Sequence, residues 1–309
     1  MPLLIDFQHG YDHFCYVVME RDISADPRFE GAIEKGKFFD YETPYGYGGP
    51  LCDQPISENA QRQFLKEFGD YAIKHGIVEQ FIRFHPLLAN QNCAPDIFET
   101  RYLHQTIYMT TSTPEQIMAD MDGKNRNMVR KAMKSGVSIE RRPIEDYNDF
   151  IPIYTETMNK DSADRYYYFS KDYFDGQSAL RDHACIFYAM MDGRPIAGAI
   201  MYYNDRFMHY HLAGTYTEFR KYSPSNLLLY EAACWASEIG VKQFHLGGGI
   251  VEDDNLFGFK KQFNKNGRLP FYVGRTIFHE DSYQYLLRVR KKLDPSFNEH
   301  NNRMTQYRY

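Results

Sequence analysis

The sequence predicts an α/β protein in which mixed, largely antiparallel sheets are flanked by helices. Two observations predict this fold class. A helical pattern over residues 57–76 leads directly into a strand pattern over residues 77–84, and alternation of helix and strand is typical of α/β proteins. Farther along, three strand patterns joined by short turns between residues 184 and 212 predict an antiparallel meander, which a helix and a further strand follow.

Length and composition indicate an ordinary globular protein. The chain has 309 residues, and one domain per roughly 150 residues predicts about two domains. Hydrophobic residues make up 43% and charged residues 25%, which excludes disordered and collagen-like classes. The formal net charge is -5, so no chain-wide positive field exists to hold nucleic acid, and any anion site must be local.

The cysteines and the N-terminus bound the cellular setting. The cysteines are odd in number, scattered and without a C-x-x-C pair, so we expect neither a disulfide framework nor a zinc site. They are Cys15, Cys52, Cys93, Cys185 and Cys234. The N-terminus has no cationic segment, and no apolar run approaches 18 residues. We therefore expect a cytoplasmic protein without a transmembrane segment that could work at a membrane surface.

The N-terminal elements follow in order. An apolar run over residues 14–21 predicts a short buried strand. Residues 43–50, TPYGYGGP, hold three glycines and two prolines, so their tyrosines are expected on a bent, exposed backbone. Ser57 is a typical N-cap and Gly76 a typical end for the helix that follows, before the strand over residues 77–84.

A basic helix is predicted in the middle of the chain. Pro114 lies in the first turn of one predicted helix, and residues 124–136 predict a second that ends at a glycine. Arg126, Arg130 and Lys134 recur every four residues, which puts three cations along one helix face. That face is either an ordinary solvated surface or a contact for an anionic ligand.

The meander follows a further helix. Residues 147–158 predict the helix, and residues 184–191 and 194–203 predict a hairpin across Asp192-Gly193, a strong two-residue turn signal. Residues 207–212 predict the third strand. These strands therefore form one antiparallel layer.

Three features after the meander could carry chemistry. A helix from Ser223-Pro224-Ser225 to Gly240 presents N–H groups suited to a phosphate or an oxyanion, although an ordinary capped helix has the same pattern. A strand over residues 241–246 ends in Gly247-Gly248-Gly249, which either admits a ligand or simply forms a loop. Lys260 could stabilise the negative charge that develops in acyl transfer or could be a surface lysine.

Other chemistries lack their usual motifs. The sequence has no G-x-S-x-G, H-E-x-x-H, G-x-G-x-x-G or Walker pattern. It therefore lacks the usual motifs of hydrolases, zinc peptidases, dehydrogenases and P-loop proteins. His209 and His211 alternate on one predicted strand and face the same side. No carboxylate or cysteine stands at a supporting spacing, so packing or hydrogen bonding is favoured for this pair, and no metal site is predicted.

Taken together and in order, these motifs resemble the FemAB family of bacterial peptidoglycan interpeptide-bridge aminoacyltransferases and the wider FemAB-like acyltransferases. The resemblance spans about residues 40–265 and rests on YETPYGYGGP, KNRNMVRKAMKSGV, YTETMNKDSADRYYYF, HLAGT, SPSNLLLYEAACWASEIG, FHLGGG and DNLFGFKKQF. It implies two tandem acetyltransferase-like (GNAT) domains over residues 1–104, shortened at its start, and 105–280. A basic C-terminal tail, residues 281–309, would follow and could contact RNA or a membrane.

The resemblance implies transfer of an aminoacyl or acyl group from an activated donor, with aminoacyl-tRNA favoured. The acceptor would be an amine of a muropeptide carried on a UDP-sugar or a lipid-linked glycan precursor in cell-wall biogenesis. Lys260 matches the lysine of the family's F-K motif near the reacting centre. The side chains expected at the acceptor are Tyr45, Tyr47, Arg126, Asn127, Arg130 and Lys131. The residues expected at the donor are Ser223, Ser225, Asn226, Gly247, Gly248 and Gly249.

The reaction needs a neutral amine, so the acceptor must lose a proton in the site. We expect relay through substrate or water, assisted by Asp254 or Tyr167, while Lys260 holds the oxyanion, with no tightly bound cofactor. One alternative is an acyl-CoA-dependent N- or O-acyltransferase acting on a surface glycan precursor, but residues 218–222 lack the glycines of a CoA loop. A second alternative is a non-catalytic sugar- or peptide-binding protein on the same scaffold.

Overall fold

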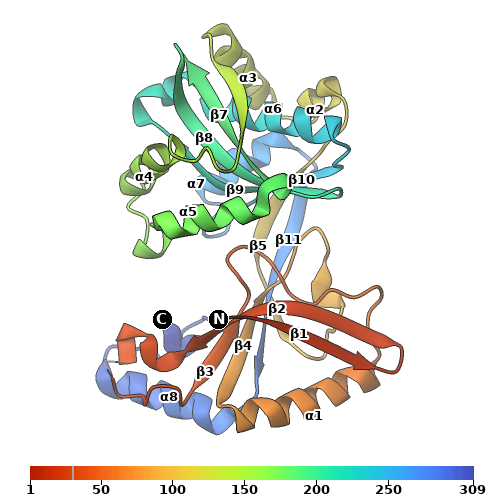
Figure 1. The fold of residues 1–309 in the computed structure, drawn as a ribbon, viewed down its shortest axis with the longest axis vertical. Coiled ribbons are helices and arrows are strands. Elements are labelled where there is room, and N and C mark those ends of the chain that lie inside the picture. Colours follow the sequence, from red (N-terminus) through yellow and green to blue (C-terminus); the bar gives the residue numbers. More distant parts are fainter. Residues whose placement is uncertain (30) are drawn as a thin grey trace. The chain divides into compact units, whose positions relative to one another are not determined.

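The structure, a computed structural model, describes residues 1–29 and 31–309 (Figure 1). Strands and helices alternate along this part of the chain, as expected for an α/β protein. None of the helices within it combines the length and the apolar composition needed to span a membrane.

The chain forms two compact units. The first unit comprises Met1–His104 and Pro270–Tyr309, and the second comprises Gln105–Leu269. The boundary predicted after residue 104 therefore coincides with a boundary between the units. The predicted end of the second domain at residue 280 and the separate tail do not match, because the chain returns to the first unit at Pro270.

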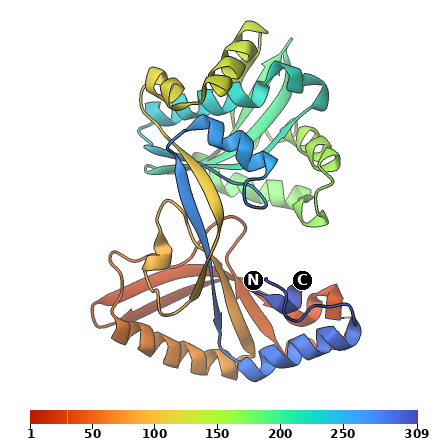
Figure 2. The ribbon, with the colours of Figure 1, turned by 180° about the vertical axis from the view of Figure 1, so that it is seen from behind.

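The first unit is a mixed sheet with two long helices along one side (Figures 1 and 2). Its strands are β1 (Pro2–His9), β2 (Asp12–Asp22), β3 (Phe39–Glu42), β4 (Ile77–Arg83) and β11 (Arg268–Ile277), and its helices are α1 (Glu58–Lys74) and α8 (Glu280–Leu293). The strands lie in the order β1-β2-β3-β4-β11. Only β3 and β4 are parallel, and α1 provides the crossover that a parallel pair requires.

Local sequence signals set the ends of α1. The hydroxyl of Ser57 accepts a hydrogen bond from the Ala60 N–H at 3.2 Å, which confirms the predicted N-cap. Gly76 has φ +70°, and a Cβ there would lie 2.3 Å from the Lys37 carbonyl oxygen, so only glycine fits. Phe64 is buried and stacks on Phe68 with ring centroids 5.0 Å apart, so the predicted apolar stripe of α1 faces the sheet.

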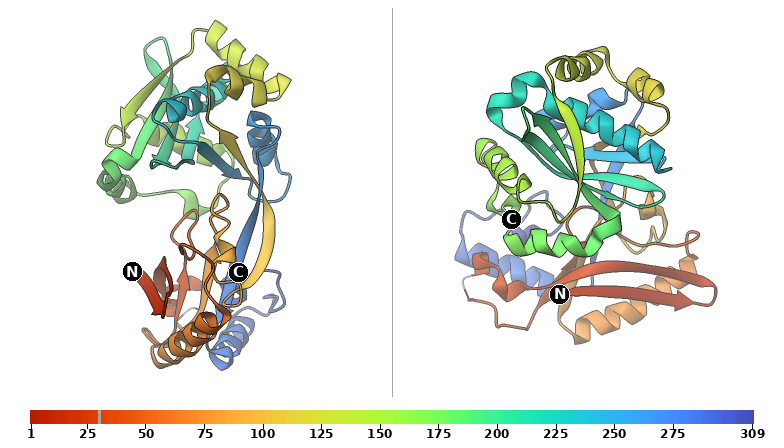
Figure 3. Two further views of the ribbon diagram at one scale, coloured as in Figure 1. Left: turned by 90° about the vertical axis from the view of Figure 1, so that its right-hand side faces the viewer. Right: turned by 45° about the horizontal axis from the view of Figure 1, so that its top comes forward.

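The second unit is a larger mixed sheet covered by helices on both faces (Figures 1 and 3). Its strands are β5 (Glu99–Thr110), β6 (Ser138–Pro143), β7 (Ala184–Met191), β8 (Arg194–Tyr203), β9 (Phe207–Thr215) and β10 (Gln243–Gly248). Its helices are α2 (Pro114–Asp120), α3 (Gly123–Lys134), α4 (Phe150–Lys160), α5 (Lys171–Gln177), α6 (Pro224–Glu238) and α7 (Asn255–Lys260). The strand order is β5-β10-β9-β8-β7-β6, and only β9 and β10 are parallel.

The predicted meander is confirmed as β7-β8-β9. Asp192 and Gly193, between β7 and β8, have φ +50° and +76°, the pair of positive values that a type I′ hairpin turn requires. One apolar core packs α3, α6 and α7 against one face of the sheet, with Val129, Leu228 and Phe244 buried in it. A second core packs α4 and α5 against the other face.

The two units share one topology. In each, two antiparallel strands are followed by a helix and then by a strand parallel to the second of them: β2-β3-α1-β4 in the first unit and β8-β9-α6-β10 in the second. The predicted fold class, tandem units with mixed, largely antiparallel sheets flanked by helices, is therefore confirmed.

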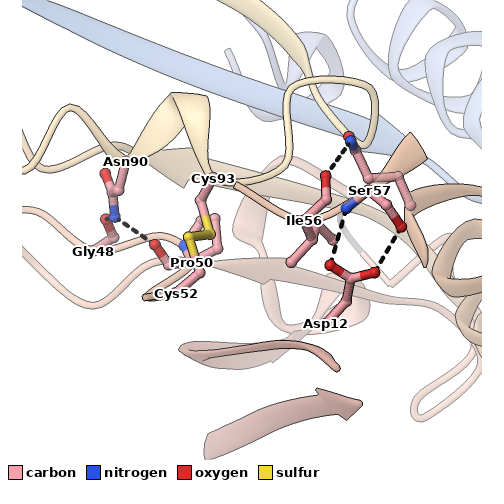
Figure 4. Close-up of a disulfide and its surroundings, with 9 residues drawn as sticks. Asp12, Gly48, Pro50, Cys52, Ile56, Ser57, Asn90 and Cys93 are labelled. Carbon is pink, nitrogen blue, oxygen red and sulfur yellow. Dashed lines mark hydrogen bonds between the residues drawn. A yellow bond between two sulfur atoms is a disulfide. The ribbon is translucent and has the colours of Figure 1, made fainter. Parts of the chain in front are cut away.

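Two features of the first unit differ from the sequence analysis. The strand β1 was not predicted; it alternates half-buried and exposed residues along a hairpin with β2. The absence of a disulfide was predicted, and this is wrong: Cys52 and Cys93 form one, with Cα atoms 6.1 Å apart (Figure 4). The pair is separated by 41 positions, so no spacing motif marks it.

The C-terminal segment is packed into the first unit. Tyr307 is fully buried, and Arg308 donates to both carboxyl oxygens of Asp40, at 2.7 and 2.9 Å. Arg308 also bonds Asp26 at 3.0 Å, and the buried Arg290 donates to the Tyr307 carbonyl at 3.2 Å. These cations hold the chain end to the first unit, because Asp40 and Asp26 are themselves buried and need counter-charges.

A second buried carboxyl lies beside this network. Glu79 on β4 is paired in register with Asp40 on β3 and is fully buried. Neither of its carboxyl oxygens has a hydrogen-bond partner among the described residues. Burial, and then the charge of Asp40, raise the pKa of Glu79 to about 8, although the charge of Arg275 opposes this.

This raised pKa predicts a pH-dependent stability. The unfolded chain releases the Glu79 proton near pH 4.5 and the folded chain near pH 8, so the free energy of unfolding falls as pH rises through that window. The isosteric variant Glu79→Gln carries no proton to lose. We expect it to be more stable than the parent at pH 8, by on the order of 3 kcal/mol, with the difference shrinking toward pH 5.

Denaturant unfolding at both pH values measures this difference. The control is Glu34→Gln, which changes an exposed carboxyl of the same unit. An equal effect of Glu79→Gln at pH 5 and pH 8 would contradict the assignment.

Candidate active site

The parallel strands β9 and β10 separate after a short paired stretch. They pair only from Phe207 and Gln243 to His209 and His245, although β9 continues to Thr215. Register shifts follow on both strands: His211 is an extra residue opposite β8, and Leu246 is an extra residue opposite β5. Such bulges bend a strand and increase its twist, so they direct β9 and β10 apart. We call the end of the paired stretch, at His209 and His245, the splay point.

Lys260 lies between the separating strands. It is the last residue of α7 and only 7% exposed, and its Nζ donates to the Gly248 carbonyl on β10 at 2.7 Å. The same Nζ is 5.6 Å from the ring centroid of Tyr210 on β9, a cation–π contact. Burial lowers the pKa of Lys260 to about 8, against the opposing charge of Asp254. The lysine predicted at the reacting centre is therefore a buried cation beside the splay point.

Asp254 holds the loop that positions α7. Its carboxylate accepts hydrogen bonds from the N–H groups of Ile250 at 2.6 Å, Val251 at 3.2 Å and Phe257 at 2.8 Å. Burial alone would raise the pKa of Asp254, but these backbone donors together hold it below its usual range. A carboxylate with a lowered pKa is a poor general base, so the geometry favours a structural role over the predicted proton relay.

Each glycine of the predicted donor triplet has a local reason. Gly247 follows the bulge with φ +76°, a conformation that suits glycine. Gly248 offers its carbonyl to Lys260. A Cβ on Gly249 would lie 2.0 Å from the Asp254 Oδ1, so a side chain there would displace the carboxylate. The triplet therefore builds the loop and orients Lys260.

The start of α6 is enclosed by neighbouring side chains. The Ser223 hydroxyl donates to the Met128 sulfur on α3 at 3.3 Å, and the Asn226 amide donates to the Asn125 Oδ1 at 2.7 Å. Ser225 and Thr215 share a hydrogen bond of 2.7 Å between their hydroxyls. All three predicted donor side chains thus lie together at the first turn of α6, with their polar atoms used in contacts to α3 and β9.

The basic helix α3 divides into a structural part and an exposed part. Arg126 is half-buried and donates to the Met121 carbonyl, so it ties α3 to the end of α2. Asn127, Arg130 and Lys131 are exposed. Of the six residues expected at the acceptor, four lie on α3: Asn127, Arg130 and Lys131 are on the surface of the second unit, whereas Arg126 serves the fold.

The tyrosines expected at the acceptor, Tyr45 and Tyr47, lie in the first unit, on a tightly held loop. The Asn90 amide donates to the carbonyls of Gly48 at 2.9 Å and Pro50 at 3.0 Å, and the disulfide closes the same loop (Figure 4). Tyr47 packs edge-on against Phe271, with ring centroids 5.2 Å apart. Tyr45 is 39% exposed, as predicted for this loop.

Tyr167 contacts a residue of α4 in the second unit. It lies in a short turn after α4, and its carbonyl accepts a hydrogen bond from the Tyr154 hydroxyl at 2.8 Å. Tyr154 packs in the core beneath α4 and α5, whereas Lys260 is held against β9 and β10 beside α7. The structure therefore places Tyr167 just beyond α4, and its assistance to the proton relay stays a prediction.

His211 confirms the packing interpretation. Its Nε2 and the Tyr173 hydroxyl lie 2.6 Å apart, and its ring stacks on Tyr202 at 4.1 Å. Burial lowers the pKa of His211 to about 3, so this imidazole is neutral. Among the described residues no cluster of three or more His, Cys, Asp or Glu side chains could hold a metal ion.

Comparison with known proteins identifies the fold. FemX matches with a TM-score of 0.70 at 14% sequence identity, over 92% of this chain and 90% of FemX. L-PGS from Bacillus licheniformis matches with 0.56 at 14% identity, over 93% and 88%. The C-terminal domain assigned to a lysylphosphatidylglycerol synthetase of Agrobacterium fabrum matches with 0.58 at 13% identity, over 93% and 88%. No curated protein matches the chain in sequence.

A family model matches the second unit. Residues 123–261 match the acetyltransferase (GNAT) domain. The chain has a FemX-like fold. The matched range includes the splay point, α6 and Lys260, so the part of the second unit that holds the candidate site is similar to an acetyltransferase (GNAT) domain.

Sequence reasoning missed two residues of the candidate site. Tyr210 supplies the ring beside Lys260, and Asn125 is fully buried with its Nδ2 lacking a partner among the described residues. Tyr210 stands between His209 and His211 on β9. Because side chains alternate between the faces of a strand, this position could have predicted that Tyr210 faces the opposite side from the histidines. Asn125 lies beside Arg126 in the basic run, where the charged residues conceal it.

Gly249→Ala tests the loop geometry. The added Cβ meets the Asp254 carboxylate, so we expect loss of the three backbone hydrogen bonds and destabilisation by about 2 kcal/mol or more. Gly258→Ala is the matched control, because nothing lies within 4 Å of a Cβ at that helical position. It should be neutral or stabilising by up to about 1 kcal/mol. Equal thermal unfolding midpoints for the two variants would refute the steric argument.

Proposed function

We propose that this protein transfers an aminoacyl or acyl group from an activated donor to an amine of a cell-wall or cell-surface precursor. The observation that carries the proposal is the buried ammonium of Lys260, held between β9 and β10 just beyond the splay point. The FemX-like fold and the acetyltransferase (GNAT) match support the same class of reaction. The likeness of FemX and L-PGS to this chain is a likeness of fold. It therefore supports the general class of reaction and not a particular donor or acceptor.

Lys260 is suited to stabilise an oxyanion. An ammonium has three N–H donors, and the Gly248 carbonyl uses one, so two are left for an oxygen that gains negative charge. Because the pKa of Lys260 is about 8, the side chain is mostly a cation at pH 7. Burial strengthens its attraction to a developing charge, since little water screens it.

The bonds change as follows. The acceptor ammonium first loses a proton to water or substrate, and the neutral nitrogen attacks the donor carbonyl carbon. The carbonyl oxygen becomes an oxyanion beside Lys260, then the bond from carbon to the donor oxygen breaks as the carbonyl reforms. The second proton of the nitrogen passes to the departing oxygen, which leaves an amide and a free hydroxyl.

The start of α6 favours aminoacyl-tRNA over acyl-CoA as the donor. A CoA pyrophosphate needs several free backbone N–H groups at a helix start. Here Pro224 has no N–H, and the Asn226 N–H is bonded to the Ser223 carbonyl at 3.2 Å. The side chains of this turn also contact α3 and β9. An aminoacyl-tRNA donor would set the reaction in the cytoplasm, with a muropeptide on a UDP-sugar or lipid as acceptor.

Binding of charged tRNA and of acetyl-CoA across a salt series separates the donors. We expect tRNA binding that weakens steeply with salt, because released counterions drive it, and no binding of acetyl-CoA. The matched variant Arg130→Ala/Lys131→Ala removes two exposed cations of α3, and we expect it to reduce the salt slope by about 2 if α3 contacts phosphate. Binding of acetyl-CoA alone would establish the acyl-CoA alternative. Binding of neither donor, with the amine acceptor still bound, would establish the non-catalytic alternative.

Lys260→Met tests the catalytic cation. The apolar replacement keeps the length of the side chain and removes the donors, so we expect turnover to fall by about 10² to 10³ with little change in fold. Lys261→Ala, next in the chain, is the control. Unchanged turnover in Lys260→Met would exclude Lys260 from the reaction.

The pH profile gives a second measurement. Turnover should fall as pH rises past about 8, because the cation is lost above its pKa. An arginine stays charged throughout this range, so Lys260→Arg should lack that falling limb if it retains turnover. A falling limb that persists unchanged in Lys260→Arg would assign the limb to another group.

A further inference from the structure

The structure sorts the basic side chains of the C-terminal segment into two groups. Arg290 and Arg308 are built into the first unit, and the Lys291 Nζ donates to the carbonyls of Pro295 at 2.9 Å and Phe297 at 2.8 Å. Arg288 and Lys292 form no ion pair or hydrogen bond with any described residue. They stand one helical turn apart on α8 and are exposed.

These two cations line a groove along α8. The groove has a volume of about 330 Å³, and its remaining lining is apolar or aromatic: Ala32, Tyr285, Val289 and Leu293. Tyr285 is 39% exposed, and its ring lies 5.9 Å from that of Phe38. The Lys37 Nζ stands over Phe38 at 5.6 Å and adds a third positive charge nearby. We call this feature the α8 groove.

We propose that the α8 groove binds the phosphate headgroup of an anionic phospholipid and holds the first unit on a membrane surface. The guanidinium of Arg288 can bind a phosphate through paired donors, and Lys292 adds a point charge beside it. Val289 and Leu293 offer apolar surface for the glycerol and the upper acyl chain. Tyr285 has the apolar body and polar tip that suit the interface between headgroups and acyl chains.

Charge and size favour a lipid over RNA. A polyanion needs many phosphates neutralised to bind at physiological salt, and the groove offers only two unpaired cations around an apolar floor. A single headgroup, in contrast, needs one phosphate contact and an apolar neighbour.

Flotation of the full chain with vesicles tests the proposal. We expect binding to vesicles that contain phosphatidylglycerol, weakened by salt, and no binding to phosphatidylcholine alone. Arg288→Ala/Lys292→Ala should weaken binding about thirtyfold. Lys66→Ala/Lys74→Ala is the matched control, because it removes two exposed charges from α1 of the same unit, and it should leave binding within about twofold.

Several results would contradict binding of a phospholipid headgroup in the α8 groove. Equal weakening by both double variants would show attraction to net charge alone, and absence of binding to phosphatidylglycerol vesicles would overturn the proposal. Inorganic phosphate that protects the groove from heat while vesicles do not bind would assign the site to free phosphate and also overturn it. Loss of tRNA binding in Arg288→Ala/Lys292→Ala, with vesicle binding intact, would assign the groove to RNA.

Transfer to a soluble acceptor separates this proposal from the proposed function. The groove and Lys260 lie in different units, so Arg288→Ala/Lys292→Ala should leave such transfer unchanged while vesicle binding falls. Membrane binding can therefore succeed or fail whether or not the protein is an acyltransferase.

Discussion

The hydrogen bond from Lys260 to the Gly248 carbonyl is the contact on which the candidate site depends. Burying an ammonium is costly unless an acceptor and a favourable ring satisfy it, and here a β10 carbonyl and Tyr210 on β9 do so. The contact therefore requires the two strands to stand at one particular separation. Asp254 helps to position Lys260, because it ties the turn after β10 to the start of α7. Gly249 leaves the space for this carboxylate.

A different electrostatic solution stabilises the first unit. Its sheet buries Asp40 and Glu79 side by side, and only Asp40 receives cations, from Arg308 and Arg21. The chain end is thereby made part of the core, which explains why residues after 270 return to this unit. Glu79 holds its proton instead, because burial and the charge of Asp40 raise its pKa by more than the charge of Arg275 lowers it. The site unit thus buries a cation at its splay point, and the first unit buries carboxyls.

Local signals in the sequence predicted most elements and failed where distant segments meet. The Ser57 cap, the Asp192-Gly193 turn and the basic helix over residues 124–136 all appear at or within a few residues of their predicted places, because each depends on neighbours in the chain. The disulfide, the return of the chain at Pro270 and the contact of Arg126 with Met121 depend on tertiary neighbours. The candidate site shows the same difference. A sequence motif predicted Lys260, whereas the contact with Tyr210 and the capping role of Asp254 could be recognised only in the folded structure.

The shared topology of the two units makes clear how they differ at the candidate site. In the first unit β3 and β4 have one register shift, between Phe39 and Asp40, and then stay paired to the end of β3 at Glu42. The loop beyond continues along β4, where the Thr43 N–H donates to the Phe81 carbonyl at 3.1 Å and the Gly48 N–H to the Arg83 carbonyl at 2.8 Å. In the second unit β9 and β10 part after three paired positions. An opening between parallel strands exposes backbone groups and admits a reacting carbonyl, whereas a closed pair cannot. In the first unit, the glycine-rich loop over residues 43–50 therefore lies beside β4 beyond the end of β3. The corresponding place in the second unit is the opening beside Lys260 that we propose for the substrates.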